Sequence, residues 1–261
     1  MRDADASAPV TARAYGIMRA VEDAHWWFDA MEAITMAVLR RGGPRDVREA
    51  LDAGCGTGRN LVFLQRFCGP GAAVTGVDHS SVALGHCHAR GLERLVRGSV
   101  NDLPLEDGRF DLVTSFDVLT AGTVDDARAL AESARVLRPG GRLLVRAAAY
   151  DFLRSRHDRE WNITRRYRRG ELRAKLEAAG LRVQAASYAN TWLFPVALAK
   201  RLAEAVRLPR EDTSDLQIGA GRGWVPAALR ALMTTERGAV AAGRLPFGLS
   251  LYALAQKPAQ S

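Results

Sequence analysis

The chain has 261 residues, 48% of them hydrophobic and 25% charged, which suits one large α/β domain or one domain with a small appendage. No basic stretch followed by an apolar run opens the sequence, and the longest apolar stretch, at 192–199, is too short to span a bilayer. The three cysteines form no CxxC pair and leave one thiol over, so we expect a cytoplasmic protein with free thiols.

The net charge of +8 would suit a nucleic-acid partner. Lysine occurs only at positions 175, 200 and 257, however, and the other basic residues are arginine. Such a skew, with abundant alanine, is more often the mark of a GC-rich genome than of a phosphate-binding surface. A positive field would still help an anionic substrate to approach.

The first half of the chain alternates between two kinds of predicted element. Residues 13–41 are expected to be helical, up to the stop at Gly42, Gly43 and Pro44. Strands are predicted at 49–54, 72–78 and 142–149, a short strand within 92–100, and a strand running into a loop at 110–119. Helices are predicted at 59–67, 80–91 and 124–137. This alternation implies βαβ units, a parallel sheet and right-handed crossovers.

The pattern changes after residue 150. Residues 151–169 are charged and aromatic without a clean period, and they precede a helix at 170–180 and a strand at 181–189. Helices at 192–206 and 225–243 then separate this strand from a last one at 250–257. We therefore expect an N-terminal helical lid (1–44) and one domain (45–261), with a helical cap inserted at about 191–247.

The stretch LDAGCGTGRN, residues 51–60, carries the strongest functional signal. A strand ends at Asp52, and Gly54, Gly56 and Gly58 then lead into a helix, so the backbone can turn sharply and approach a ligand. The third glycine comes one residue too early for the pyrophosphate fingerprint, which disfavours a dehydrogenase. Asp78, at the end of the next strand, suits an acceptor for two ribose hydroxyls.

Four stretches in order, LDAGCGTGRN, GVDHS, LPLEDGRFDLV and ARVLRPGGRLLV, resemble the class I S-adenosylmethionine-dependent methyltransferases over roughly residues 45–150. The resemblance implies a Rossmann-like, doubly wound sheet of seven mostly parallel strands with an antiparallel last strand, and S-adenosylmethionine as the cofactor. By position it implies these cofactor-binding residues: Asp52 and the loop Gly54, Cys55, Gly56 and Gly58 for the methionine part, Asp78 for the ribose, His79, Ser99 and Val100 for the adenine, and Phe116 beside the sulfonium.

The flanks resemble a narrower, bacterial subgroup of small-molecule methyltransferases, through HWWF at 25–28, RRY at 165–167 and NTWLFP at 190–195. Relatives commonly read DVLEHV after the fourth strand, whereas this chain reads DVLTAG at 117–122. Thr120 and Ala121 thus replace a Glu and a His, and the most obvious general base is missing. Methyl transfer is largely a matter of in-line positioning, so an acidic phenol, an enol or an amine would need little base.

Other residues remain as candidate bases and substrate contacts. We predict His157, His25 and Tyr167 as catalytic candidates, although both histidines could equally be structural. Trp26, Tyr15, Asp117 and Asn190 are expected on the substrate side.

Metal and polymer binding find little support. His86 and His88 are two apart on a helix and point away from each other, and nothing fixes Asp117, Asp125 and Asp126 around Mg²⁺, so no metal is expected. The eight arginines within 154–173 form either a solvated mixed-charge face or an anchor for a substrate carboxylate or phosphate. The Asn/Asp-Pro-Pro-aromatic motif of DNA methylases is missing, which argues against DNA.

Three hypotheses follow. The first is a methyltransferase of a small, possibly anionic, organic molecule, in natural-product metabolism, acting as a monomer or a homodimer. The second, suggested by the altered DVLTAG stretch, is a protein that binds the cofactor but catalyses a non-methylating step such as a cyclisation. The third, suggested by the arginine excess, is an RNA or protein methyltransferase.

The HWWF stretch could pack into the core or cover the site. Adjacent residues on a helix point about 100° apart, so Trp26 and Trp27 cannot share a face. We expect one tryptophan to anchor the helix and the other to roof the site together with His25, and we favour Trp26 for the roof.

Overall fold

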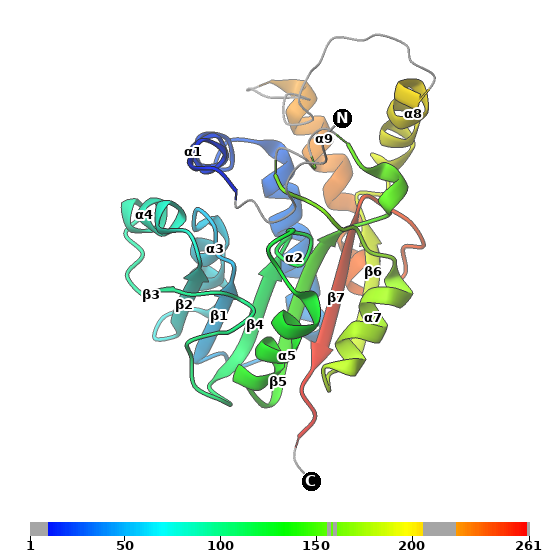
Figure 1. The fold of residues 1–261 in the computed structure, drawn as a ribbon. Helices are drawn as coiled ribbons and strands as arrows, with labels where there is room; N and C mark the ends of the chain where they lie inside the picture. Colours follow the sequence, from blue (N-terminus) through cyan, green and yellow to red (C-terminus); the bar gives the residue numbers. More distant parts are fainter. Residues whose placement is uncertain (1–9, 156–157, 159–160, 206–222, 260–261) are drawn as a thin grey trace.

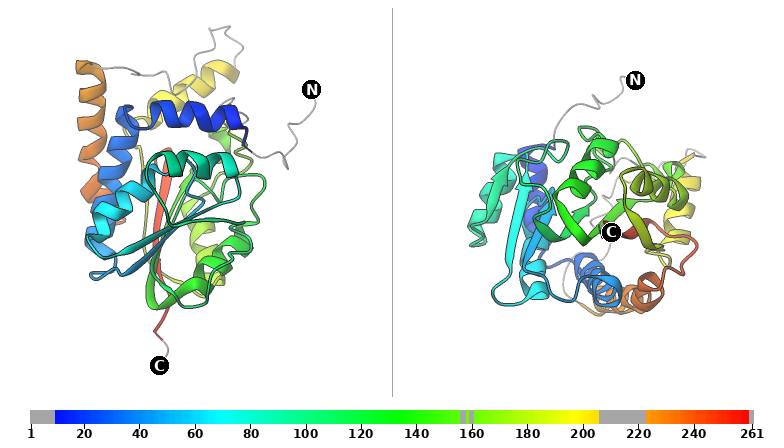
Figure 2. Two further views of the ribbon diagram at one scale, coloured as in Figure 1. Left: turned by 90° about the vertical axis from the view of Figure 1, so that its left-hand side faces the viewer. Right: turned by 90° about the horizontal axis from the view of Figure 1, so that it is seen from below.

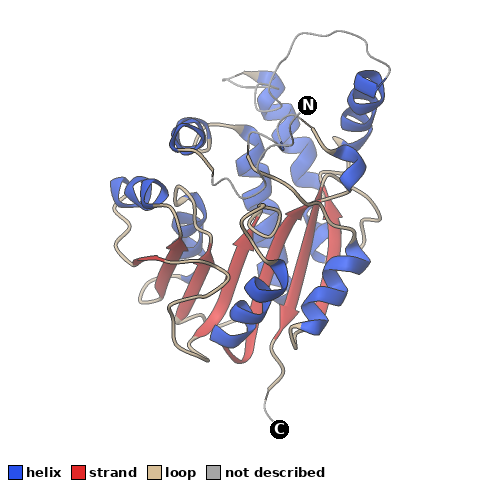
Figure 3. Ribbon diagram, viewed as in Figure 1, coloured by secondary structure: helices blue, strands red, loops and turns tan. Residues whose placement is uncertain are grey.

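A computed structural model describes residues 10–155, 158, 161–205 and 223–259. They form one seven-stranded sheet in the order β3-β2-β1-β4-β5-β7-β6 (Figures 1 and 3). The strands are β1 (Glu49–Ala53), β2 (Ala73–Asp78), β3 (Leu95–Arg97), β4 (Phe110–Phe116), β5 (Leu137–Ala148), β6 (Arg182–Ala189) and β7 (Ser250–Gln256). β7 runs antiparallel to both its neighbours, as predicted, and the pairs among β1 to β5 are parallel.

Helices cover both faces of the sheet (Figure 2). One face carries α2 (Trp26–Gly42), α3 (Arg59–Cys68), α9 (Trp224–Thr235) and α10 (Arg237–Ala241), and the other carries α5 (Asp126–Val136) and α7 (Arg169–Ala178). Every residue of β4 is buried, because a central parallel strand is covered on both sides. The continuous apolar runs in the sequence therefore predicted these strands well.

The remaining helices surround the carboxyl edge of the sheet. They are α1 (Ala12–Val21), α4 (Ser81–Ala89), the short 3-10 helix η1 (Asp151–Leu153) and α8 (Phe194–Ala205). Together with α9 and α10, α8 occupies the stretch between β6 and β7 where the sequence suggests a cap. Within the described residues, no helix combines the length and the apolar character needed to cross a membrane.

Two predicted helices are each divided in the structure. The predicted helix at 13–41 is wrong, because α1 ends at Val21 and α2 starts at Trp26. His25 has extended backbone dihedrals and its Nδ1 accepts the N–H of Trp27 at 3.2 Å, so it caps a new helix. Similarly, the predicted helix at 225–243 breaks at Glu236, between α9 and α10.

Candidate active site

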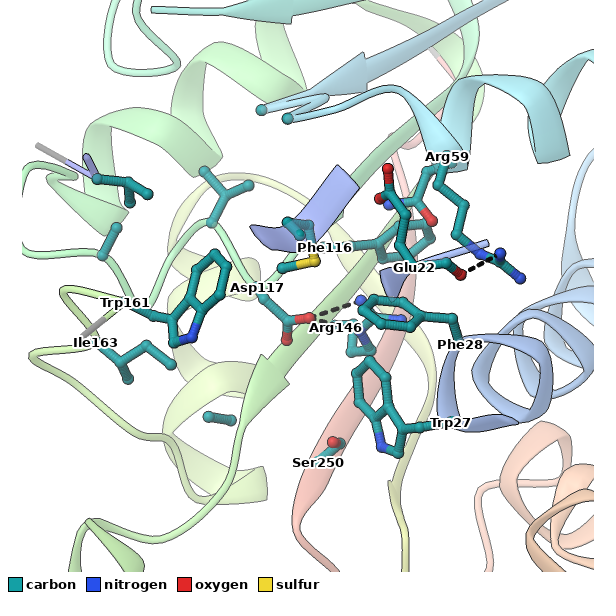
Figure 4. Close-up of a pocket in the computed structure, with 18 of the residues that line it drawn as sticks. Glu22, Trp27, Phe28, Arg59, Phe116, Asp117, Arg146, Trp161, Ile163 and Ser250 are labelled. Atoms are coloured by element: carbon teal, nitrogen blue, oxygen red, sulfur yellow. Dashed lines mark hydrogen bonds and ion pairs between the residues drawn. The ribbon is translucent and has the colours of Figure 1, made fainter. Parts of the chain in front are cut away.

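A cavity of about 680 Å³ opens at the carboxyl ends of the parallel strands, within the range of about 300–1,000 Å³ that is usual for small-molecule sites. Loops after β1, β2 and β3 line one half, and Asp117 after β4 together with residues of α2, α8, β5 and β7 line the other. We call them the cofactor half and the substrate half. Figure 4 shows part of the lining.

The glycine loop forms the floor of the cofactor half. Gly54, Gly56 and Gly58 have φ of 85°, 52° and 88°, a region that favours glycine. A Cβ on Gly54 would lie 2.3 Å from Val118, whereas one on Gly56 would meet nothing within 4 Å. The backbone at Gly56 is therefore open on its cavity side, as a cradle for a bound molecule requires.

Asp78 lies beside this loop at the end of β2. Its Oδ2 accepts the N–H of Gly56 and its Oδ1 accepts the N–H of Ser80, both at 2.9 Å, so the carboxylate is held in place. It lines the cavity, as a ribose acceptor must, and His79, which is exposed, follows it there. Tyr15 from α1, which we expected on the substrate side, lies on this side instead, where burial first, and the nearby Asp78 charge second, raise the pKa of its hydroxyl.

Ser99, Val100 and Phe116 also line the cavity, in the order that the resemblance implies. The Ser99 hydroxyl accepts the N–H of Asn101, which fixes the turn after β3. Phe116 ends β4 and is buried between the two halves. These residues fit S-adenosylmethionine as a bound group, whose sulfonium supplies an activated methyl group.

Asp52 departs from its predicted role. Its side chain is fully buried and does not line the cavity, and Oδ1 accepts the hydroxyl of Thr114 at 2.7 Å. No partner of Oδ2 is found in the described part of the chain. Burial raises the pKa of Asp52 to about 7, although Thr114 and Arg146 oppose the change. Direct cofactor binding by this carboxyl is therefore not what the geometry supports. Cys55 does line the cavity.

A network that the sequence analysis missed ties the N-terminal helices to the glycine loop. Glu22, which is buried between α1 and α2, accepts the hydroxyl of Thr57 at 2.7 Å and Nη2 of Arg90 at 2.5 Å. Arg59 bonds to the carbonyl of Glu22 and to Asp29. Because Thr57 follows Gly56 directly, this network couples the position of the α1–α2 turn to that of the cofactor loop.

The four residues of HWWF all line the cavity, but the two tryptophans have the opposite places to those we predicted. Trp26 is 5% exposed and belongs to the core cluster under α2. Trp27 is partly buried, and its ring lies 5.3 Å from the guanidinium carbon of Arg146. The anchor is therefore Trp26 and the residue beside the substrate half is Trp27, the reverse of what we expected. His25 is buried as the cap of α2.

Asp117 and Arg146 form a charge pair in the substrate half (Figure 4). Nε and Nη2 of Arg146 lie 2.8 and 2.6 Å from Oδ2 of Asp117. Arg146 is a cation within the buried stretch 143–147 of β5, whose other residues are apolar, and burying a charge is costly unless it is paired. That pattern is the signal by which the sequence could have revealed Arg146.

Asn190 and Ser250 form a neutral polar pair at the same edge. Asn190 is 1% exposed, has a φ of 62° and donates its amide to the Ser250 hydroxyl at 2.7 Å. Both residues line the cavity, and the contact of Asn190 with a substrate stays a prediction.

One of the predicted bases, Tyr167, lies away from the site that the structure describes. Tyr167 is fully buried outside the cavity, and its hydroxyl donates to the carboxylate of Asp126 at 2.7 Å. Burial, then the Asp126 contact, raises the pKa of Tyr167, so the prediction of this residue as a base is wrong. His157 lies outside the described residues.

Arg165 and Arg166 of the arginine-rich segment are both paired with acids. Arg166 lines the cavity but both its Nε and Nη2 bind Asp158. Arg165 binds Asp126 and Glu171. Arg156 and Arg159 fall outside the described residues. No cluster of three metal-ligating side chains occurs in the described ranges, and Asp126 is occupied by Tyr167, Lys175 and Arg165.

Comparison with known proteins agrees with this geometry. Residues 51–145 match the family model described as a methyltransferase domain. A Mycolicibacterium smegmatis protein named as a probable S-adenosylmethionine-dependent methyltransferase is 32% identical over 61% of this chain and 61% of its own length. The demethylmenaquinone methyltransferase of Staphylococcus aureus is 39% identical over 40% of this chain and 44% of its own. The chain thus spans less than two thirds of the length of either relative.

Two solved structures share the fold. An S-adenosylmethionine-dependent methyltransferase from Thermotoga maritima matches with a TM-score of 0.58 and 18% identity, over 94% of this chain and 95% of that one. The [4+2]-cyclase SpnF matches with a TM-score of 0.57 and 25% identity, over 90% of this chain and 83% of that one.

The sheet order, the glycine loop and these matches define the class. The chain has the fold of the class I S-adenosylmethionine-dependent methyltransferases, and its cofactor is S-adenosylmethionine. Within this fold, residues 51–145 match the methyltransferase-domain family, and the chain is similar to bacterial proteins named as methyltransferases.

Proposed function

We propose that this protein transfers the methyl group of S-adenosylmethionine to a small organic molecule, and that natural-product metabolism supplies that molecule. The observation that carries the proposal is the second half of the cavity. Beyond Phe116 the lining continues with Trp27, Leu193, Leu249 and the polar pairs around Arg146 and Asn190. An apolar enclosure with a few convergent polar groups is typical of a small-molecule site and gives an RNA or protein chain little access.

The test is transfer of label from methyl-labelled S-adenosylmethionine. We expect label in small molecules from a bacterial extract and formation of S-adenosylhomocysteine in equal amount. Asp78→Ala, which removes the expected ribose contact, serves as the control. Label in RNA or protein, and none in small molecules, would contradict the proposal.

A second candidate is a reaction without methyl transfer, such as a cyclisation. It is supported by the altered DVLTAG stretch and by the similarity to SpnF. Thr120, where relatives carry Glu, is fully buried and donates its hydroxyl to the carbonyl of Asp117, so it serves the turn rather than catalysis. Product formation that consumes no S-adenosylmethionine would favour this candidate.

A further inference from the structure

The substrate half holds one charged group with an open hydrogen-bonding position. Both bonds from Arg146 go to Oδ2 of Asp117, and no contact to Oδ1 is found among the residues described. The Asp117 side chain is 37% exposed and points into the space that Trp27 and Trp161 border in Figure 4. Oδ1 can therefore accept a hydrogen bond from a bound molecule.

The backbone holds Asp117 close to the place of methyl transfer. Asp117 follows Phe116, the residue expected beside the sulfonium, and has a φ of 62°, an uncommon conformation for a residue with a side chain. Its N–H donates to the carbonyl of Arg146 at 2.8 Å, and its carbonyl accepts the Thr120 hydroxyl at 2.7 Å. These bonds hold the left-handed turn that directs the carboxylate into the cavity.

Arg146 gives this position its electrostatic character. Its side chain is 8% exposed, and its guanidinium carbon lies 5.0 Å from the Phe116 ring and 5.3 Å from the Trp27 ring. In such apolar surroundings, charges interact much more strongly than in water. When Asp117 takes up a proton, its charge no longer balances that of Arg146, so an oxygen that has lost its proton to Asp117 would be stabilised by the Arg146 guanidinium.

The walls restrict the shape of the molecule. Trp161 and Ile163 approach from the segment after η1, and Trp27 approaches from α2, with Asp117 between them (Figure 4). Flat aromatic walls favour a flat guest, because stacked rings bury area without distortion.

Building on the proposed function, we infer that the substrate is a planar molecule whose methyl-accepting group is a weakly acidic hydroxyl, a phenol or an enol, and that Asp117 is the catalytic residue that accepts its proton. This assignment supplies the base that the DVLTAG stretch lacks at its usual place.

The step balances in atoms and charge. A lone pair of the hydroxyl oxygen forms the new bond to the methyl carbon, while the methyl–sulfur bond breaks and its electron pair stays on sulfur. The hydroxyl proton moves to Oδ1 of Asp117 and later to water. The products are the methyl ether, S-adenosylhomocysteine and one proton.

The first experiment compares Asp117→Asn with the wild-type chain on phenols of graded acidity, an enolised diketone, an aliphatic alcohol and an amine. The matched control is Asp46→Asn, because the Asp46 side chain is 79% exposed and outside the cavity. We expect methylation of the phenols and the diketone, and a loss of roughly 10²–10⁴-fold in Asp117→Asn that is smallest for the most acidic phenol. Asp46→Asn should match the wild type.

The second experiment needs no turnover. With S-adenosylhomocysteine bound, para-nitrophenol is titrated into each protein and its ionisation is followed by its colour. Asn at position 117 leaves Arg146 without its counter-charge, so the pKa of bound para-nitrophenol should fall by about one to two relative to its value in the wild-type complex. Equal values, or no binding to the wild-type complex, would overturn the inference.

The outcomes separate the inference from the proposed function. Methylation of the alcohol or the amine at a rate that Asp117→Asn does not change would overturn the inference and leave methyl transfer intact. If no acceptor is methylated, the proposed function fails, and the para-nitrophenol titration alone decides the role of Asp117. Stabilisation of each variant by S-adenosylhomocysteine confirms that it is folded.

Discussion

Replacing Asp52 by Asn tests whether this buried carboxyl makes the free energy of unfolding depend on pH. Burial raises the pKa of Asp52 from its ordinary value of 3.8 to about 7 in the folded chain. The folded state therefore keeps this proton to higher pH than the unfolded state does. Its contribution to the free energy of unfolding is greatest below pH 3.8 and is lost as the pH rises to about 7.

The expected difference in the free energy of unfolding depends on the pH range in which the protein can be unfolded by urea. Between about pH 5 and about pH 8, the free energy of unfolding of the wild type should fall by about 3 kcal/mol more than that of Asp52→Asn, because each unit of pKa corresponds to about 1.4 kcal/mol. Urea unfolding of both proteins, followed by tryptophan fluorescence, measures the difference. Parallel pH dependence of the two proteins would refute the reasoning, and a large loss of S-adenosylhomocysteine affinity in the variant would refute the placement of Asp52 away from the cofactor.

Three further substitutions test the site. Asp78→Ala should weaken S-adenosylhomocysteine binding by about 100-fold in calorimetry, because two hydroxyls lose a charged acceptor; unchanged affinity would exclude the ribose role. Tyr167→Phe should cost about 1–3 kcal/mol in urea unfolding, since Asp126 loses a buried donor, with kcat unchanged; a selective loss of kcat would make Tyr167 a base after all. Glu22→Gln should speed S-adenosylhomocysteine release in stopped-flow measurements, because Thr57 and Arg90 lose their shared charge; an unchanged rate would show that this network does not hold the loop.

The sequence predicts the sheet well because neighbouring residues alone indicate each strand. β1, β2 and β4 are short, mostly apolar stretches that are followed by a glycine or end at or before an acid, and the predicted bounds agree closely with the structure. The break between α1 and α2 is different. The residues around it are all compatible with a helix, and the helix restarts because the His25 side chain accepts a backbone N–H, a cap that serine, threonine or aspartate more often provides.

The geometry of the glycine loop was predictable for the same reason, since Gly54, Gly56 and Gly58 act through backbone conformation at their own positions, and Asp78 stands at the end of the next predicted strand. The substrate half depends on contacts between distant segments. Asp117 follows β4 and meets Arg146 of the neighbouring strand β5, and Asn190 meets Ser250 from positions 60 residues apart. No short motif encodes such pairs, so only the folded chain reveals them.

The N-terminal helices contact both halves of the cavity, and this explains the role of the HWWF stretch. At one end Glu22 holds Thr57 of the cofactor loop, and at the other Trp27 lies against Arg146 of the substrate half. Trp26, anchored in the core, fixes the start of α2 between these contacts. A shift of the α1–α2 turn would therefore disturb the cofactor loop and the Arg146 charge together. Because methyl transfer depends on in-line placement of two reactants, a rigid link between their two binding regions favours the reactive geometry.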